Sequence, residues 1–283
     1  MAGDGEIGMD PRFSLKQYPR KDTIFQHKKS LNFDLIRAKV YREREKSKMT
    51  DFMEYVAYIL LGVAVGFVSA LLSMSEEWIT SNKSTYANKL IDGTSNNLFK
   101  AWAFFSCISI CMAVSASCLT VWWGPGASGS GVAELIAYMN GVNYPNVFSV
   151  PTLITKIYGV LMAVCGGLCV GKEGPLAHIG SNLALMIIHL PFESFKWLQN
   201  DASKRQFIAA GASAGVSAAF GAPIGGTLFA YEISKPNTFW KFSVLWKIFF
   251  SCATAVFTLA LFQALFTGGE LLVTTSSVLK FGV

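Results

Sequence analysis

The chain has 283 residues, of which 52% are hydrophobic and only 15% are charged, and its mean hydropathy is +0.40. Soluble domains carry charge on about a quarter of their residues, so this composition excludes an ordinary soluble globular protein. The net charge of +6 is concentrated at one end of the chain, which is not the pattern of a nucleic-acid-binding face.

The first segment, residues 1–50, is polar and rich in Lys and Arg, with no apolar core of a secretory signal. By the positive-inside rule it is predicted to be a cytoplasmic tail. A contact with anionic lipids or a partner is the alternative to a solvated tail that only sets the topology.

Apolar runs that follow indicate an all-α polytopic membrane domain over residues 51–267. The first span is predicted at Phe52–Met74, where Gly62 and Gly66 share one face and would let a neighbouring helix approach closely. The polar segment Ser75–Lys100 is then expected to face the lumen or the exterior. It contains a glycosylation sequon, Asn82-Lys83-Ser84.

The second span is predicted at Ala101–Trp123, and it runs directly into the sequence GPGASGSG. Four glycines and a proline in eight residues cannot continue a helix. Gly129, Ser130 and Gly131 then open a short helical pattern, for which Ser130 is a suitable N-cap. An ordinary capping loop and an anion-binding helix start both fit this segment.

The third apolar run, Phe148–Val170, leads into the sequence VGKEGPLAHIG. Lys172 and Glu173 thus fall near membrane depth, where a charge costs about 2.5–3.5 kcal/mol on insertion scales and is first treated as functional. Pro175 suits the first turn of a new helix, so we expect an unwound break between two helices. Glu173 would lie at the positive end of the second helix and compete with a free anion there.

Two other interpretations of this stretch exist. Residues 166–173, GGLCVGKE, match a phosphate-binding loop except that Glu173 replaces the hydroxyl residue, and no soluble α/β pattern surrounds them. Alternatively, Lys172 and Glu173 form a surface ion pair at the end of an ordinary helix.

The remaining runs are rich in small or aromatic residues. Pro175–Leu190 carries His178 and His189, which we expect to be packed or interfacial rather than catalytic. Phe207–Ile233 is dense in Gly, Ala and Ser, and Pro223 should divide it into two short helices. Phe239–Phe266 is the last span. The six cysteines all lie in apolar runs and are expected to be small buried residues rather than disulfides or metal ligands.

Three stretches, in this order and spacing, resemble the CLC family of chloride channels and anion/proton exchangers. They are GSG with Glu134 nearby, GKEGP, and GAPIGG leading into LFAYE. The resemblance covers the chain from Leu31 onward, and SLNFD and TFWKFSVLWKIFF are most similar to the endolysosomal branch. It implies a homodimer with one pore per subunit and a fold of two inverted halves of broken, tilted helices, of which this chain supplies the first.

The resemblance also assigns roles by position. Ser130, flanked by Gly129 and Gly131, corresponds to the serine that coordinates the central anion and goes with a preference for chloride. Glu173 corresponds to the gating glutamate. The residues that correspond to the frame of the gate are Gly171, Lys172, Gly174 and Pro175. No cofactor, metal or enzymatic activity is implied; the transported ion would be chloride.

Three departures from the family pattern matter. Ala133 replaces the proline of the Ser-Gly-Ile-Pro-Glu motif. Glu232 matches the first of two adjacent acids of exchangers, but Ile233 replaces the second, which favours a voltage-gated channel; an antiporter using Glu232 is the alternative. The chain also covers only the first half, with residues 268–283 beginning a connection, so we expect a fragment of a longer transporter or, alternatively, a non-conducting regulatory partner. An endolysosomal or other intracellular membrane is favoured.

Overall fold

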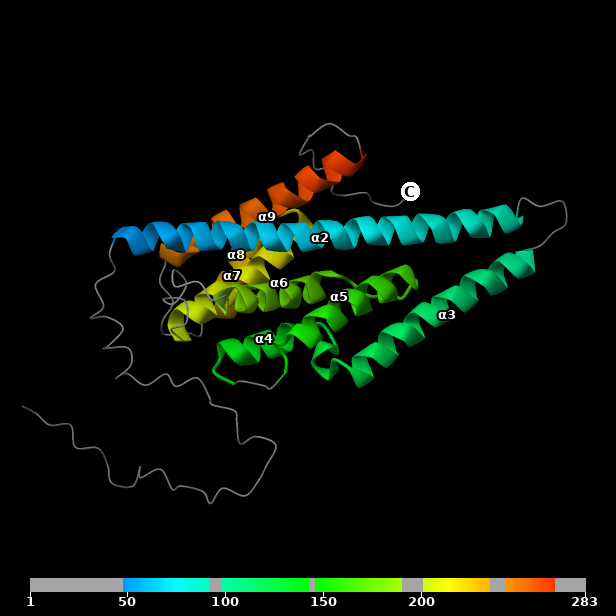
Figure 1. The fold of residues 1–283 in the computed structure, drawn as a ribbon, viewed down its shortest axis with the longest axis horizontal. Helices are drawn as coiled ribbons and strands as arrows, with labels where there is room; N and C mark the ends of the chain where they lie inside the picture. Colours follow the sequence, from blue (N-terminus) through cyan, green and yellow to red (C-terminus); the bar gives the residue numbers. More distant parts are fainter. Residues whose placement is uncertain (1–47, 92–97, 143–145, 190–200, 235–242, 268–283) are drawn as a thin grey trace, which may run out of the picture.

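The computed structural model describes residues 48–91, 98–142, 146–189, 201–234 and 243–267, which are drawn in colour in Figure 1. Within these ranges the regular structure is entirely helical, which confirms the all-α fold. Residues 1–47 of the predicted basic tail (residues 1–50) and the predicted connecting segment (residues 268–283) lie outside the described residues, whereas residues 48–50 belong to the first described helix.

Helix α2 (Lys48–Ile91) is much longer than predicted. Its 44 residues would span about 66 Å, roughly twice the hydrocarbon core of a bilayer. The polar segment that follows the predicted span Phe52–Met74 continues the same helix up to Ile91, because it contains no Gly or Pro to end the helix. The sequon at Asn82 consequently lies within this helix rather than in a loop.

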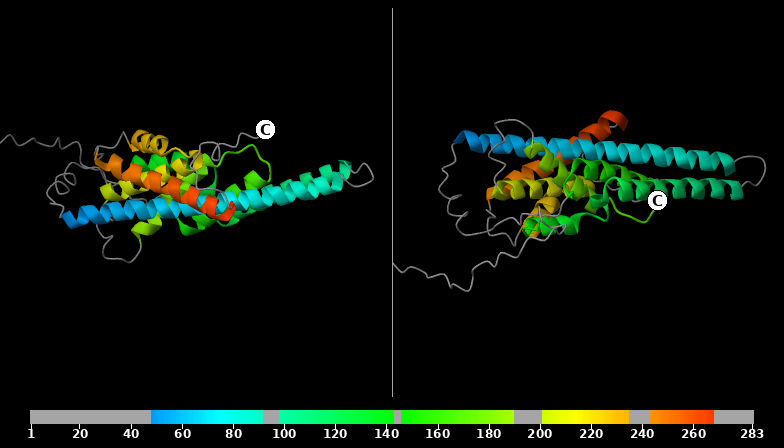
Figure 2. Two further views of the ribbon diagram at one scale, coloured as in Figure 1. Left: turned by 90° about the horizontal axis from the view of Figure 1, so that it is seen from above. Right: turned by 60° about the horizontal axis from the view of Figure 1, so that its bottom comes forward.

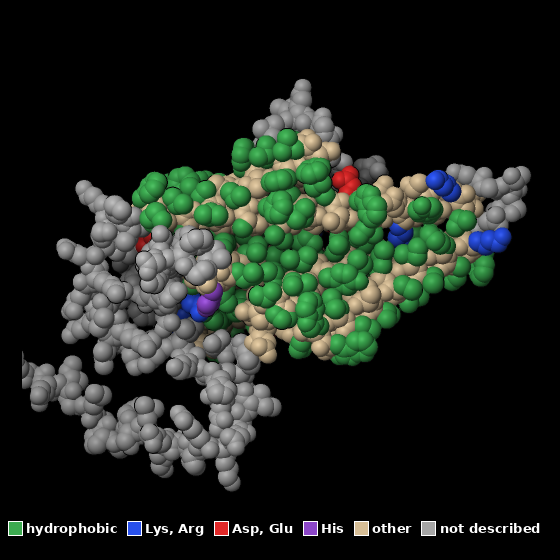
Figure 3. All heavy atoms as spheres, viewed as in Figure 1, with side chains coloured by type: hydrophobic (Ala, Val, Ile, Leu, Met, Phe, Trp, Pro, Cys, Tyr) green, Lys and Arg blue, Asp and Glu red, His purple; other side chains and the backbone are tan. Residues whose placement is uncertain are grey.

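Helix α3 (Leu98–Trp122) turns back beside α2, and Figures 1 and 2 show the far part of α2 and the start of α3 extending together beyond the other helices. Helices α2, α3 and α9 (Ser243–Thr267) each contain an apolar stretch long enough to cross a membrane. In Figure 3 hydrophobic side chains cover most of one face of the molecule, with few charged groups among them. The chain is an integral membrane protein.

Shorter helices fill the space between these spans. They are the 3₁₀ helix η2 (Pro125–Ala127), α4 (Val132–Met139), α5 (Val150–Cys165), α6 (Glu173–Ile188), α7 (Asp201–Phe220) and α8 (Pro223–Ser234). Pro223 is the first residue of α8, which confirms that the small-residue run forms two helices.

Small residues bring helix backbones into direct contact, as predicted. A Cβ atom on Gly180 of α6 would collide with the carbonyl oxygen of Gly211 in α7, and one on Gly215 would collide with that of Leu176. Gly62 and Gly66 of α2 lie in the same way against α9, facing the carbonyl oxygens of Ser251 and Ala255. These contacts leave no room for a side chain and fix α6, α7, α2 and α9 as the packed centre of the molecule.

The prediction for the cysteines was wrong in part. Cys165 and Cys252 are buried, whereas Cys107, Cys111 and Cys169 are exposed. Helix α3 lies at the edge of the bundle, and its apolar stretch packs almost no side chain against the rest of the protein. Cys107 and Cys111 on this helix are therefore exposed although they are surrounded by apolar sequence, and Cys118 near its end is half-buried.

Candidate functional site

The segment around Ser130 links η2 to α4 and depends on two glycines. Gly129 and Gly131 have φ angles of +66° and +82°, in the left-handed region that favours glycine. Gly131, not Ser130 as predicted, occupies the N-cap position of α4. The Ser130 hydroxyl still accepts a hydrogen bond from the backbone N–H of Val132, at 3.3 Å, and it is exposed. It therefore stands just in front of the helix start.

The predicted break before Glu173 is confirmed. Helix α5 ends at Cys165, the chain is not helical from residue 166 to residue 172, and α6 begins at Glu173 with Pro175 in its first turn. Residues 166–173 follow a helix rather than a strand, which removes the structural context that a phosphate-binding loop requires.

The half-buried side chain of Glu173 folds back toward the preceding residues. Its carboxylate oxygen Oε2 occupies the space that a Cβ atom on Gly171 would need. Glycine at position 171 is thus what allows the carboxylate to lie over its own backbone break. As the first residue of α6, Glu173 also faces the unpaired N–H groups and the positive end of the helix dipole.

These two segments, some 40 residues apart in sequence, meet in space. A Cβ atom on Gly174 would lie 2.8 Å from the Cβ of Ser130, so the first turn of α6 packs directly on the Ser130 segment. Beside this contact lies a cavity of about 640 Å³, walled by α3 and α5. Its lining includes Gly129, Ser130, Gly171 and Pro175. Four of the predicted site residues therefore border one space.

Lys172 pairs with a residue that the sequence did not suggest. Its Nζ lies 3.0 Å from Oε2 of Glu76 on α2, a residue 96 positions earlier in the chain. The contact found for Lys172 is therefore with Glu76, in place of the surface pair with Glu173 considered from the sequence.

Lys156 is a second residue that sequence reasoning missed. It lies in the middle of α5, is only 2% exposed, and donates hydrogen bonds to the carbonyl oxygens of Ala127 (2.9 Å) and Gly129 (2.8 Å). A buried ammonium group thus holds the segment that carries Ser130 and places positive charge behind it. The sequence does contain an indication of this role, because Lys156 is the one charged residue of an otherwise uncharged apolar helix.

The two histidines of the Pro175–Leu190 run are buried and exposed, respectively. His178 is fully buried beneath the Ser130 segment, where a Cβ atom on Gly131 would lie 2.5 Å from the imidazole Cγ. His189 follows the last turn of α6 and is exposed.

The predicted proton-path residue is not at this site. Glu232 is exposed on α8, and none of the residues that line the cavity beside Ser130 comes from α8. Its neighbour Ile233 is 7% exposed and belongs to the apolar core. Ala133, which replaces a proline, lies in the first turn of α4, and α4 forms without that proline. Among the described residues, no group of three or more His, Cys, Asp or Glu side chains could hold a metal ion.

Comparison with known proteins gives a consistent result. The family described as voltage gated chloride channel matches residues 110–282. Chloride channel protein A of Dictyostelium discoideum is 36% identical over 267 residues, which are 90% of this chain and 30% of that protein. H(+)/Cl(-) exchange transporter 7 of Homo sapiens is 30% identical over 291 residues, covering 97% of this chain and 36% of that protein. These names describe transport proteins rather than enzymes.

Solved structures support the same fold. A eukaryotic CLC transporter superimposes with a TM-score of 0.67 at 22% identity, covering 77% of this chain and 39% of that one. A slow cyanobacterial Cl⁻/H⁺ antiporter gives a TM-score of 0.65 at 25% identity, covering 75% and 47%. The chain spans about a third of the length of the curated relatives it matches. With the family match extending over more than half of its residues, the chain belongs to the voltage-gated chloride channel family, also called CLC.

Proposed function

We propose that this chain carries part of a chloride pathway through a membrane, with Ser130 coordinating the anion and Glu173 acting as its gate. The observation that carries this proposal is the contact between the Ser130 segment and the first turn of α6 beside one cavity. The N-termini of α4 and α6 offer backbone N–H groups and positive dipole ends there.

The chemistry of the site suits passage rather than tight capture. An anion would meet helix dipoles, the Ser130 hydroxyl and a cavity wall that includes Lys156, whose ammonium is only 2% exposed and already donates to two backbone carbonyl oxygens. Such binding is favourable enough for entry and weak enough for release. The Glu173 carboxylate would occupy the anion's place when ionised, and its protonation or displacement would open the pathway.

Channel-like transport is favoured over proton-coupled exchange. The relevant observation is that Ile233, which cannot carry a proton, is buried in the core, while Glu232 is exposed and away from the cavity. The competing proposal, chloride/proton antiport, is supported by the similarity of this chain to H(+)/Cl(-) exchange transporter 7.

The assembly and location belong to the same proposal. We infer a homodimer in a lipid bilayer, with a cytoplasmic N-terminus and an intracellular, endolysosomal-type membrane as its site. Large apolar side chains exposed on α8, such as Ile224 (68%) and Leu228 (59%), are suited to such a subunit contact.

The test is ion flux in liposomes that contain the protein expressed from its complete native coding sequence. We expect chloride efflux without stoichiometric proton movement. Proton uptake against its gradient, driven by chloride, would replace the channel by the antiporter. Flux that appears only with a longer co-assembled relative would favour the regulatory-partner alternative, and absence of chloride flux in every combination would refute the proposed function.

A further inference from the structure

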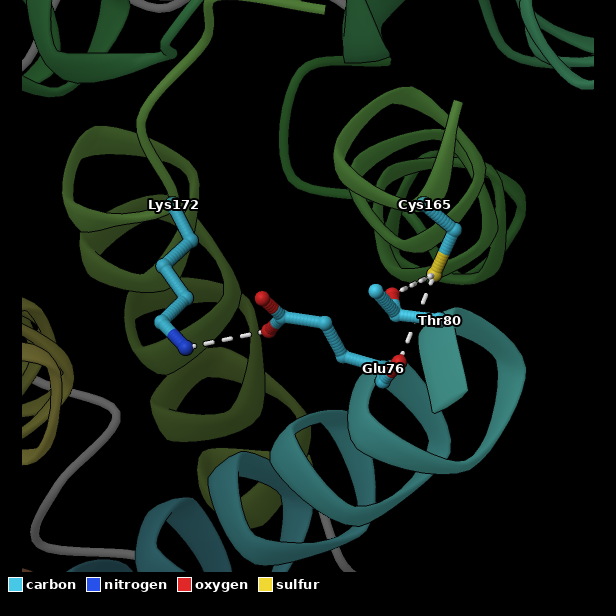
Figure 4. A network of polar contacts seen from close by, with 4 residues as sticks. All are labelled: Glu76, Thr80, Cys165 and Lys172. Atoms are coloured by element: carbon cyan, nitrogen blue, oxygen red, sulfur yellow. Dashed lines mark hydrogen bonds and ion pairs between the residues drawn. The ribbon is translucent and has the colours of Figure 1, made fainter. Parts of the chain in front are cut away.

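One face of α2 carries a polar stripe where the helix passes the break before the proposed gate. Glu76, Thr80 and Lys83 follow one another at intervals of four and three residues, so their side chains share a face of the helix. All three contact residues at the end of α5 or the start of α6. Figure 4 shows the part of this arrangement formed by Glu76, Thr80, Cys165 and Lys172.

The end of α5 is held from one side of the break. Lys83 is 6% exposed, and its Nζ donates to the carbonyl oxygen of Cys165, the last residue of α5, at 3.1 Å. The Cys165 thiol makes two longer contacts, with the Thr80 hydroxyl at 4.0 Å and with the backbone oxygen of Glu76 at 3.9 Å. The position where the chain leaves α5 is therefore fixed against α2.

The start of α6 is held from the other side of the break by one contact. The Glu76 carboxylate accepts a hydrogen bond from Lys172 Nζ at 3.0 Å, with the two side chains 28% and 34% exposed. Figure 4 shows the Glu76 carboxylate and the Lys172 ammonium pointing toward each other across the space between α2 and α6. Lys172 is the residue directly before Glu173, so this pair anchors the backbone from which the gate projects.

We propose that Glu76 is a positioning residue for the gate, acting through Lys172. This inference rests on the proposed function. The pair keeps the Lys172 ammonium directed at α2, and it neutralises a positive charge that would otherwise be free beside the Glu173 carboxylate. Without Glu76 the released ammonium would favour the ionised, blocking form of Glu173.

If the Glu76–Lys172 pair served only to stabilise the fold, its removal would lower the stability of the protein. Partly exposed ion pairs contribute little to folding stability, so removal of this one should leave the protein folded. Glu77 provides a matched control, because it is the next acid on the same helix but is exposed and outside the stripe. The two glutamates differ in their contact with Lys172, not in their charge.

Other charged or titratable groups near the first turn of α6 stay unchanged in this comparison. On the elements packed against it they are Lys83 on α2, Glu134 on α4, Lys156 and Cys165 on α5, and His178 on α6. Lys204 and Arg205 of α7 lie toward the far end of α6, because Gly211 and Gly215 face Gly180 and Leu176 in antiparallel order.

The experiment is a double-mutant cycle of Glu76→Gln and Lys172→Met, with Glu77→Gln as control, in protein expressed from its complete native coding sequence. The first measurement is the pH at which chloride flux into liposomes is half-maximal. Glu76→Gln should move this pH toward acid by about half a unit or more, since an uncompensated positive charge favours the carboxylate. In the Lys172→Met background Glu76→Gln removes the same carboxylate charge but releases no ammonium, so its effect should be clearly smaller, and Glu77→Gln should have no effect in either background.

The second measurement does not require transport. With Glu173→Cys as a reporter, the rates at which anionic and cationic methanethiosulfonates modify residue 173 are followed by peptide mass spectrometry, which separates this thiol from the native cysteines. Glu76→Gln should raise the ratio of anionic to cationic rates about tenfold, because a change in potential equal to half a pH unit alters each of the two rates about threefold in opposite directions. The rise should be clearly smaller in the Lys172→Met background.

A ratio that Glu76→Gln leaves unchanged, or changes equally in the Lys172→Met background, would overturn the proposal. This ratio is measured without chloride flux. If the protein did not transport chloride, the proposed function would be refuted, but the modification rates would still test whether Glu76 acts on position 173 through Lys172.

Discussion

The two ends of α6 differ in how they are held, and the difference separates stability from function. From Leu176 onward the helix is mostly buried and lies backbone to backbone on α7 through Gly180, Gly211 and Gly215. Its first turn, by contrast, is half-buried, and polar side chains from α2 and the Ser130 segment surround it. The close-packed part of α6 thus holds the helix in place, while the side chains of its first turn, next to the cavity, are free to adjust.

The packed end should be the more sensitive to added volume. Gly180→Leu would drive a side chain into the carbonyl oxygen of Gly211, and we expect a loss of more than about 3 kcal/mol of stability, seen as no folded peak in size-exclusion chromatography. Gly225→Ala is the control. Its added Cβ meets only Ala222 at 3.5 Å, so a gain of about 0.5–1 kcal/mol is expected from helix propensity, measured as a higher Tm.

A substitution in the first turn of α6, the adjustable end, should have the reverse outcome: a large change in chloride flux without unfolding. Glu173→Ala removes the carboxylate that folds over Gly171 while leaving the packed part of α6 intact. We expect chloride flux that no longer varies with pH and varies less with voltage, at an unchanged Tm. A mutant that retains the pH response of the original protein would exclude Glu173 as the gate.

Substitution of Lys156, which lies behind the Ser130 segment, should have a smaller effect on transport. Lys156→Met keeps the length of the side chain but removes the charge and both hydrogen bonds to the Ala127 and Gly129 carbonyls. Chloride affinity should fall about tenfold, or ~1.4 kcal/mol. Lys156→Arg, which keeps the charge, is the comparison; an equal loss in both variants would show that packing rather than charge matters at this position.

The smallest effect on chloride binding is expected when the exposed hydroxyl of Ser130 is removed. Ser130→Ala removes one neutral hydrogen-bond donor from the anion and leaves the helix N–H groups in place, so chloride affinity should fall by about three- to tenfold. Titration calorimetry with chloride would measure it. If Ser130→Ala lowered chloride affinity much more than Lys156→Met does, the hydroxyl would contribute more to anion binding than its exposed position suggests.

The broken-helix plan could be predicted from sequence because local chemistry determines it. Clustered glycines together with a proline favour the end of one helix and the start of another, and so the break before Glu173 and the division at Pro223 appeared as expected. Close approach through Gly62, Gly66, Gly211 and Gly215 followed from the same residues, although the partner helices could not be assigned.

What could not be predicted depends on contacts between distant segments. The outer half of α2 has no apolar periodicity, so the pattern of apolar residues did not show that the helix continues past the membrane span. The pairing of Glu76 with Lys172 joins residues 96 positions apart. Lys156 was an exception, because a single charge in an apolar helix already indicated a functional or structural role.

The central claim, that an anion site lies beside the contact between Ser130 and the first turn of α6, can be tested by locating the anion itself. Crystals of the protein and of Glu173→Ala, soaked in bromide, would be measured by anomalous diffraction. The account predicts a bromide peak within hydrogen-bond distance of the Ser130 hydroxyl in both, and an additional peak near Gly171 only when the Glu173 carboxylate is gone. Bromide that avoids Ser130 in both crystals would contradict it.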